Sequence, residues 1–192
     1  MLSSPGRQPG RLAFAGPSNY VGYSEGDAGV AEVLRDIADG IRGTGRFTPH
    51  SPMVRETAEE ILNADGWPPT DSGRVFSLYE WVRAHAVYPP VADRRGVEEL
   101  RGADYSLHRI ETLGRLAGDC DCLTILLGSL IASVLDIPQR LKPVWFGTSD
   151  DGHVYLEICL RDVGWICADL IDNQPLGWCP TGVTRYGAPV PV

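Results

Sequence analysis

The sequence GDCDCLTILLGSLIASVLDIP occupies residues 118–138. Its apolar run is shorter than the ~20 residues that a helix needs to cross a bilayer, and a helix that is apolar on all sides belongs in a protein core. The residue before a proline is pushed out of helical dihedrals, so the helix should end at Ile137-Pro138. We therefore predict a buried central helix over residues 119–136.

Three segments after this helix have the composition of β-strands. They are rich in β-branched and aromatic residues and cover residues 141–146, 154–160 and 165–170. In the second of them, Val154, Leu156 and other aliphatic residues alternate with more polar ones, as in a strand with one face in the core. These segments predict an antiparallel sheet packed on the central helix.

Helical signals dominate the first half of the chain. An apolar stripe over residues 30–41 follows a capping serine, a second helix is expected from Ser51-Pro52, and a third over residues 71–86. Residues 91–117 give mixed signals and are expected to form a loop with short helical turns. Because helices come first and strands afterwards, the sequence predicts the α+β class.

The two ends of the chain lack these patterns. Residues 1–23 are rich in Gly, Pro, Ser and Arg, which predicts an extended or mobile arm, and no apolar segment there resembles a secretory signal. Residues 181–192 are expected to form a C-terminal tail. A chain of 192 residues then holds one folded domain, over residues 24–180.

The net charge and the number of cysteines limit which binding partners and which cellular compartment are expected for the protein. The chain has 17 Lys and Arg against 25 Asp and Glu, a net charge of −8, which repels nucleic acid and anionic membranes on average. A protein or peptide substrate is expected instead. Five cysteines are an odd number and do not suggest a disulfide framework, so Cys159, Cys167 and Cys179 are expected to be inert and the protein to be cytoplasmic.

Cys120 is the candidate nucleophile because it lies where the central helix begins. Unpaired backbone N–H groups and the positive end of the helix dipole lower the pKa of a thiol there, and the thiolate is the nucleophilic form. Asp119 and Asp121 act in the opposite direction, since carboxylates disfavour a nearby thiolate. A neighbouring imidazolium is needed to offset them.

His153 is the candidate base, at the start of a predicted strand. The following strand offers two acids that can orient its ring, because the register of the hairpin is open. A turn centred on residue 161 places Asp169 opposite His153, whereas a two-residue turn at 162–163 places Asp172 there, and a bulge would shift the pairing further. His108 is a fallback base.

Four motifs in this order resemble the transglutaminase-like superfamily over about residues 52–172. They are GDCD at 118–121, LDIPQR at 135–140, GHVYLE at 152–157, and GW at 164–165 followed by Asp169. The helical segment 76–82 and the following Tyr88 also look like the part that precedes the cysteine motif in this superfamily. Within it, the chain is most similar to small transglutaminase-like proteins of tailed bacteriophages.

The resemblance implies a papain-like α+β fold with a Cys-His-Asp triad. Cys120 is then the nucleophile, His153 the general acid and base, and Asp169 the orienting acid. The implied activity is that of a peptidase, deamidase or acyl transferase that forms a thioester and needs no cofactor and no metal. Many relatives carry a second acid where this chain has Cys122, which faces about 200° away from Cys120 on a helix and is expected to be buried.

Two other interpretations stay open. The fold can act as a docking scaffold in a larger assembly such as a phage particle, with the terminal arms as contacts and the protein incorporated in a virion. A zinc site from Cys120, Cys122, His153 and Asp169 has suitable ligand types, but Cys-x-Cys lacks the usual gap of zinc motifs.

Overall fold

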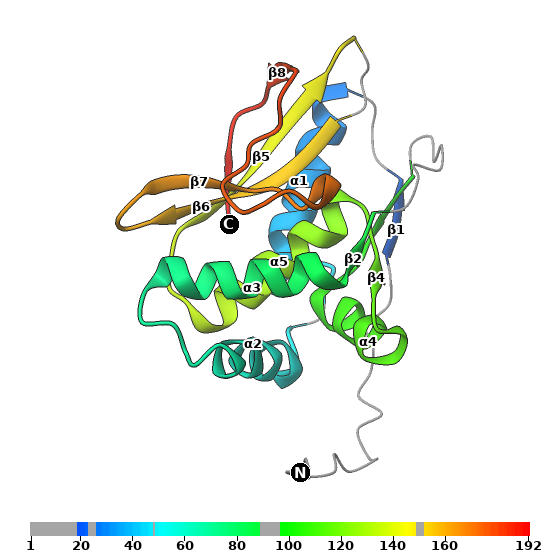
Figure 1. The fold of residues 1–192 in the computed structure, drawn as a ribbon. Helices are drawn as coiled ribbons and strands as arrows, with labels where there is room; N and C mark the ends of the chain where they lie inside the picture. Colours follow the sequence, from blue (N-terminus) through cyan, green and yellow to red (C-terminus); the bar gives the residue numbers. More distant parts are fainter. Residues whose placement is uncertain (1–18, 23–25, 48, 89–96, 149–151) are drawn as a thin grey trace.

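The computed structural model describes five parts of the chain, residues 19–22, 26–47, 49–88, 97–148 and 152–192. Helix α5 (Cys120–Val134) lies at the centre, with the strands of the main sheet on one side and α2 on the other (Figure 1). Four further helices contact it: α1 (Gly26–Arg42), α2 (Pro52–Ala64), α3 (Asp71–His85) and α4 (Ala103–Leu113). The predicted central helix is confirmed.

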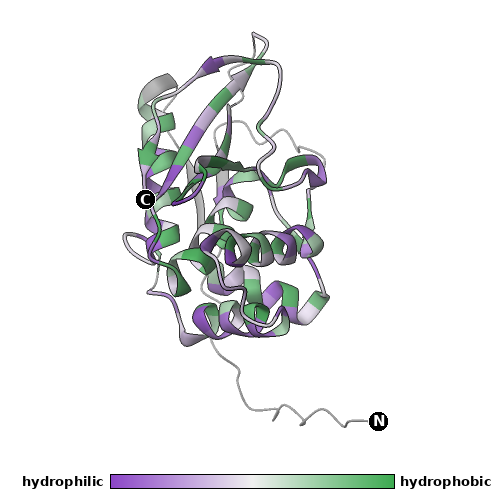
Figure 2. Ribbon diagram, turned by 60° about the vertical axis from the view of Figure 1, so that its left-hand side comes forward, coloured by the Kyte–Doolittle hydropathy of each residue, from purple (hydrophilic) through white to green (hydrophobic). Residues whose placement is uncertain are grey.

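Helix α5 is buried on all sides from Asp121 to Ile131 because most of these residues are apolar. Ile125, Leu126 and Leu130 have no exposed surface, and they pack on the outer helices and on the sheet. The outer helices carry both hydrophilic and hydrophobic residues, as amphipathic helices with one buried side do (Figure 2). Among the described residues, no helix combines the length and the apolar character that a membrane span requires.

Glycines set the close approach of α1 and α5. A Cβ atom added at Gly128 would lie 2.8 Å from Cδ1 of Ile41, and one added at Gly40 would lie 3.0 Å from Cδ1 of Ile125. No side chain fits at Gly128 without displacing Ile41, since packed carbon atoms stay about 3.5–4.0 Å apart. These two glycines let the backbones of α1 and α5 come together over the core.

The starts of α2 and α5 follow local capping signals. Ser51 caps α2 by accepting the backbone N–H of Met53 at 3.3 Å, with Pro52 in the first turn, as the sequence predicts. Asp119 caps α5, since its Oδ1 accepts the backbone N–H of Cys122 at 3.2 Å. The start of α5, and with it the position of Cys120, is therefore fixed by its own neighbours in sequence.

The main sheet is antiparallel, in the strand order β7-β6-β5-β8 with β9 also on β5. Its strands are β5 (Gln139–Phe146), β6 (Gly152–Leu160), β7 (Gly164–Ala168), β8 (Val183–Tyr186) and β9 (Val190–Pro191). One face, with Val154 and Leu156, joins the core over α5, and the other carries a small cluster with Val144 and Tyr155. Helices precede this sheet in the chain, so the predicted α+β class is confirmed.

The segment over residues 91–117 differs from the expected loop. Its described part forms β3 (Val97–Leu100), α4 (Ala103–Leu113) and the two-residue strand β4 (Leu116–Ala117). Helix α4 begins at Gly102, which provides no side-chain cap, so the usual start signal is missing from the sequence. Its buried face, including Leu107 and Ile110, packs on the core.

The chain ends also carry strands. Of the arm expected over residues 1–23, the structure describes Asn19–Gly22, which forms β1 and pairs with β3, while residues 1–18 and 23 lie outside the described residues. The expected tail over residues 181–192 contributes β8 and β9, which pair with β5. The C-terminal residues therefore extend the main sheet.

Candidate active site

Cys120 lies at the first turn of α5, half-buried. Its Sγ donates a hydrogen bond to Oδ1 of Asp121 at 3.3 Å, and the backbone N–H of Val154 in β6 also faces the sulfur. Strand β7 pairs with β6 only as far as Leu156, so no β7 residue pairs with Val154. The helix start and the end of this hairpin thus meet at the sulfur.

The thiol of Cys120 is not activated in this arrangement. Burial raises its pKa well above the ordinary value, the carboxylates of Asp121 and Asp119 raise it further, and the N–H of Val154 opposes them only in part. The expected lowering by the helix start is therefore outweighed. At neutral pH the sulfur carries its proton.

His153 and Asp169 form a buried pair. Nε2 of His153 lies 2.8 Å from Oδ2 of Asp169, with the two residues 7% and 2% exposed. A carboxylate only accepts hydrogen bonds, so Nε2 donates, and in the neutral form of the ring Nδ1 is the nitrogen that carries the lone pair. The second carboxylate oxygen of Asp169 accepts the backbone N–H of Ile171 at 3.0 Å.

The hairpin register differs from both sequence alternatives. Leu160 pairs with Gly164, so the turn is centred on residue 162, and Gly164 adopts a φ of +83° that favours glycine. The ladder ends before His153, which reaches Asp169 diagonally rather than directly across the strands. Asp172, the other candidate acid, is exposed and makes no hydrogen bond or ion pair among the described residues.

Cys120 and His153 are close in the fold but not hydrogen bonded to each other. The sulfur bonds to Asp121, although the residue whose N–H faces it is the chain neighbour of His153. By strand alternation His153 lies on the sheet face that carries Val144, its partner in β5, opposite the face of Val154. The structure therefore brings two of the three predicted residues into contact and the third to the adjoining backbone.

Tyr88 is a site residue to which sequence reasoning assigned no role. Burial raises the pKa of its hydroxyl, and the side chain and backbone of Cys120 both interact with that hydroxyl. A short parallel pairing of β2 (Ala86–Val87) with β4 places it there, and the N–H of Gly118 bonds to the carbonyl of Val87 at 3.2 Å. The superfamily-like segment ending at Tyr88 was the only sequence signal.

Cys122 is buried, as predicted. Its sulfur donates to the backbone carbonyl of Glu99 at 3.1 Å, so the thiol is engaged away from the sulfur of Cys120. In the described part of the chain, no group of three or more His, Cys, Asp or Glu residues is arranged to hold a metal ion. His108, the fallback base, lies on α4, and its backbone carbonyl accepts the hydroxyl of Thr112.

The loop that follows β7 is tied down from several sides. The buried hydroxyl of Tyr79 in α3 donates to the carbonyls of Asp169 and of Gln174, the latter at 2.8 Å. Cys167 and Cys179 form a disulfide, with their Cα atoms 5.4 Å apart. These contacts fix the backbone on which Asp169 lies.

The disulfide corrects the expectation that Cys167 and Cys179 are inert. An odd number of cysteines argues against a framework of bridges but leaves room for one pair. The pairing depends on the return of the loop to β7, where the N–H of Gly177 bonds to the carbonyl of Cys167 at 2.9 Å. Cys159 is free and half-buried.

Comparisons with known proteins find fold likeness at low identity. No protein-family model matches the chain, and no curated protein matches it. The solved structures similar to it include a proposed cysteine protease from Cytophaga hutchinsonii, with 16% identity and a TM-score of 0.47, over 82% of this chain and 49% of that one. Another is a proposed protease from Parabacteroides distasonis, with 12% identity and a TM-score of 0.47, over 71% of this chain and 26% of that one.

The chain thus spans about half of the first of these proteins and about a quarter of the second. At such identities and TM-scores the likenesses carry no argument about activity.

Proposed function

We propose that this protein is a cysteine-dependent enzyme that acts on amide bonds. The observation that carries the proposal is the buried hydrogen bond between His153 and Asp169, together with the backbone N–H of the next residue, Val154, which faces the sulfur of Cys120. An imidazole held by a buried carboxylate, whose other nitrogen makes no hydrogen bond among the described residues, is the arrangement of a general base. The order of the motifs, similar to that of the transglutaminase-like superfamily, supports the same role for each residue.

The chemistry begins from a neutral thiol. As Sγ of Cys120 attacks the carbonyl carbon of an amide, Nδ1 of His153 takes the thiol proton. The tetrahedral intermediate collapses to a thioester when His153 gives that proton to the leaving amine. Water or a second amine then attacks the thioester, His153 takes and returns the proton, and the free thiol is restored.

Two features of the site bear on the first step. The backbone N–H of Cys120 at the helix start can donate to the developing oxyanion, and the hydroxyl of Tyr88 occupies that position before the substrate arrives. The sulfur must also leave Asp121 to meet Nδ1. Hydrogen bonds between catalytic groups are often long or unformed in a free enzyme and tighten when the substrate is bound.

A substrate-like alkylating probe tests the proposal. A blocked peptide ending in norleucyl chloromethyl ketone should modify Cys120 at neutral pH, as shown by mass spectrometry of the digested protein. The reaction should be lost in Cys120→Ala and strongly slowed in His153→Ala. The half-buried Cys159 is the matched control, and it should stay unmodified in all three proteins.

Absence of modification at Cys120, or a rate that His153→Ala leaves unchanged, argues against an enzyme. That outcome favours the second interpretation, a scaffold that keeps the fold as a docking surface in a larger assembly. Circular dichroism of each variant shows whether the fold is retained.

A further inference from the structure

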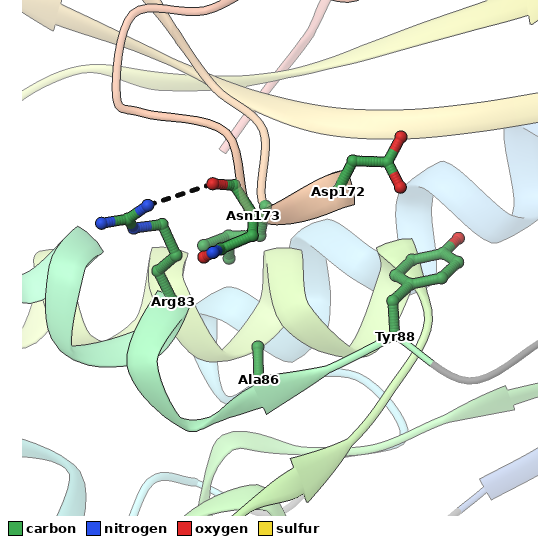
Figure 3. A pocket seen from close by; sticks show the side chains of 6 residues that line it. Arg83, Ala86, Tyr88, Asp172 and Asn173 are labelled. Atoms are coloured by element: carbon green, nitrogen blue, oxygen red, sulfur yellow. Dashed lines mark hydrogen bonds between the residues drawn. The ribbon is translucent and has the colours of Figure 1, made fainter.

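A pocket of about 200 Å³ adjoins the candidate active site (Figure 3). It lies between the end of α3, the strand β2 and the loop that follows β7, and its lining residues are Arg83, Ala86, Tyr88, Leu170, Asp172 and Asn173. Pockets for complete drug-sized ligands are larger, about 300–1,000 Å³. The size therefore suits one long side chain.

The pocket contains one free negative charge. Arg83 is neutralised, because its guanidinium forms an ion pair with Glu80 and also donates to the carbonyl of Asn173 at 3.0 Å. The exposed carboxylate of Asp172 has no ion pair within the described residues. In Figure 3 this carboxylate and the hydroxyl of Tyr88 lie at the same end of the pocket.

The backbone that carries the carboxylate of Asp172 is held in place before any ligand binds. Asp172 and Asn173 adopt φ values of +51° and +56°, a left-handed conformation that is uncommon for residues other than glycine. The bond from Arg83 to Asn173, the bond from Tyr79 to Gln174 and the disulfide that closes the loop keep this backbone in position. A backbone fixed in advance reduces the entropy that is lost when a ligand pairs with the side chain it carries.

Tyr88 connects the pocket to the reacting sulfur. Its ring lines the pocket, and its hydroxyl interacts with both the side chain and the backbone of Cys120. A group in the pocket is therefore next to an amide that reaches Cys120. The apolar side chains of Ala86 and Leu170 are suited to the aliphatic stem of a long side chain whose charged end stays near solvent.

We propose that this pocket binds the lysine or arginine side chain of the substrate residue whose carbonyl group Cys120 attacks, with the cation paired to the carboxylate of Asp172. This assignment rests on the proposed function and adds to it a preference for the type of substrate residue. The aliphatic stem packs on Ala86 and Leu170. An acidic side chain in the same position is repelled.

Matched alkylating probes test the specificity separately from the activity. Blocked peptides that differ only in their last residue carry lysyl, arginyl, norleucyl or glutamyl chloromethyl ketone, and the rate of modification at Cys120 is measured for each. Norleucine has the aliphatic stem of lysine without the charge. We expect the lysyl and arginyl probes to react about fivefold faster than the norleucyl probe, as for a partly exposed charge pair, and the glutamyl probe to react slowest.

The variant Asp172→Asn removes the charge and keeps the shape, and asparagine tolerates the left-handed conformation. In this variant the cationic and norleucyl probes should react at nearly equal rates. The matched control is Asp65→Asn, which makes the same chemical change at an exposed residue at the end of α2 and should preserve the fivefold preference.

Each outcome has a defined meaning. The specificity is overturned if the cationic probes react no faster than the norleucyl probe in the wild type, or if their preference survives Asp172→Asn. In either case, modification of Cys120 by the norleucyl probe still supports the proposed enzyme. Failure of every probe to modify Cys120 contradicts the proposed function and the specificity with it.

Discussion

The two sides of the candidate site are prepared to different degrees. On the sheet side, His153 is buried and bonded to Asp169, and the loop that carries the acid is tied by Tyr79 and a disulfide. On the helix side, the sulfur of Cys120 is protonated and bonded to the carboxylate of Asp121. In the proposed mechanism the base is thus positioned before the reaction, whereas the nucleophile is not.

This difference indicates at which step of the proposed reaction the thiol proton of Cys120 moves to His153. A preformed thiolate and imidazolium pair requires surroundings that favour the charged sulfur, and burial with two nearby carboxylates does the opposite. The proton should therefore pass to His153 as the sulfur attacks. We therefore expect Cys120 to react slowly with small thiol reagents at neutral pH and faster with probes that fill the site.

The largest expected effect is at the base. Asp169→Asn replaces an acceptor with an amide that can also donate, so the ring of His153 is no longer held in the tautomer with a free Nδ1. Modification of Cys120 by the norleucyl probe should slow by about a thousandfold. The measurement is the second-order rate at neutral pH, with Asp65→Asn as the control, and a loss of less than tenfold would remove Asp169 from the triad.

The disulfide should have the next largest effect, on stability. Cys167 and Cys179 are 12 residues apart, and closing a loop of this length contributes about 3 kcal/mol in the chain-entropy description. Cys179→Ser should lower the free energy of unfolding in urea by about this amount, and the same loss should appear when reductant is added to the wild type. Cys159→Ser serves as the control because Cys159 is free.

Thiol counting gives an independent check on the bridge. Under denaturing conditions without reductant, the protein should show three free thiols, those of Cys120, Cys122 and Cys159. Five free thiols in protein prepared without reductant would contradict the disulfide.

A smaller effect is expected at Tyr79. Its hydroxyl donates to the carbonyls of Asp169 and Gln174, and Tyr79→Phe leaves both without this donor. The two carbonyls share one O–H donor, so the free energy of unfolding should fall by about 1 kcal/mol, the contribution of one hydrogen bond. Tyr186→Phe is the matched control at an exposed tyrosine and should change stability by less than about 0.5 kcal/mol. Equal losses in the two variants would mean that Tyr79 does not anchor the loop.

The smallest effect concerns the sulfur side and its dependence on pH. Because the pKa of the Cys120 thiol is raised, its reaction with iodoacetamide should be slow at neutral pH and still increase above pH ~8.5, where an ordinary thiol has half ionised. Asp121→Asn removes one of the causes, so the rate curve should shift to lower pH and the rate at pH 8 should rise severalfold. A wild-type rate that is already constant between pH 6 and 8 would show a preformed thiolate.

Much of the fold follows from local sequence. The all-round apolar character of α5 predicts its burial, and Ser51 with Pro52 predicts the start of α2. Helix α4 was missed because Gly102 offers no capping side chain, and β8 and β9 because short edge strands have little pattern of their own. Their positions are decided by packing against elements far away in the chain.

Local sequence likewise predicts one part of the candidate site and not the other. Spacing along the chain places Cys120 at a helix start and His153 on a strand, but the choice of Asp169 depends on a turn centred on residue 162, between the two expected positions. The protonated state of Cys120 depends on burial, which local sequence does not report. The disulfide and Tyr88 reach the site through tertiary contacts alone.

A crystal structure of the protein with Cys120 modified by the norleucyl probe measures the relation between sulfur and imidazole directly. We predict that Nδ1 of His153 lies within about 3.2 Å of the sulfur or of the probe's carbonyl oxygen, while Nε2 stays bonded to Asp169. A ring that stays turned away from the modified cysteine, or that has left Asp169, would contradict the pairing of Cys120 with His153.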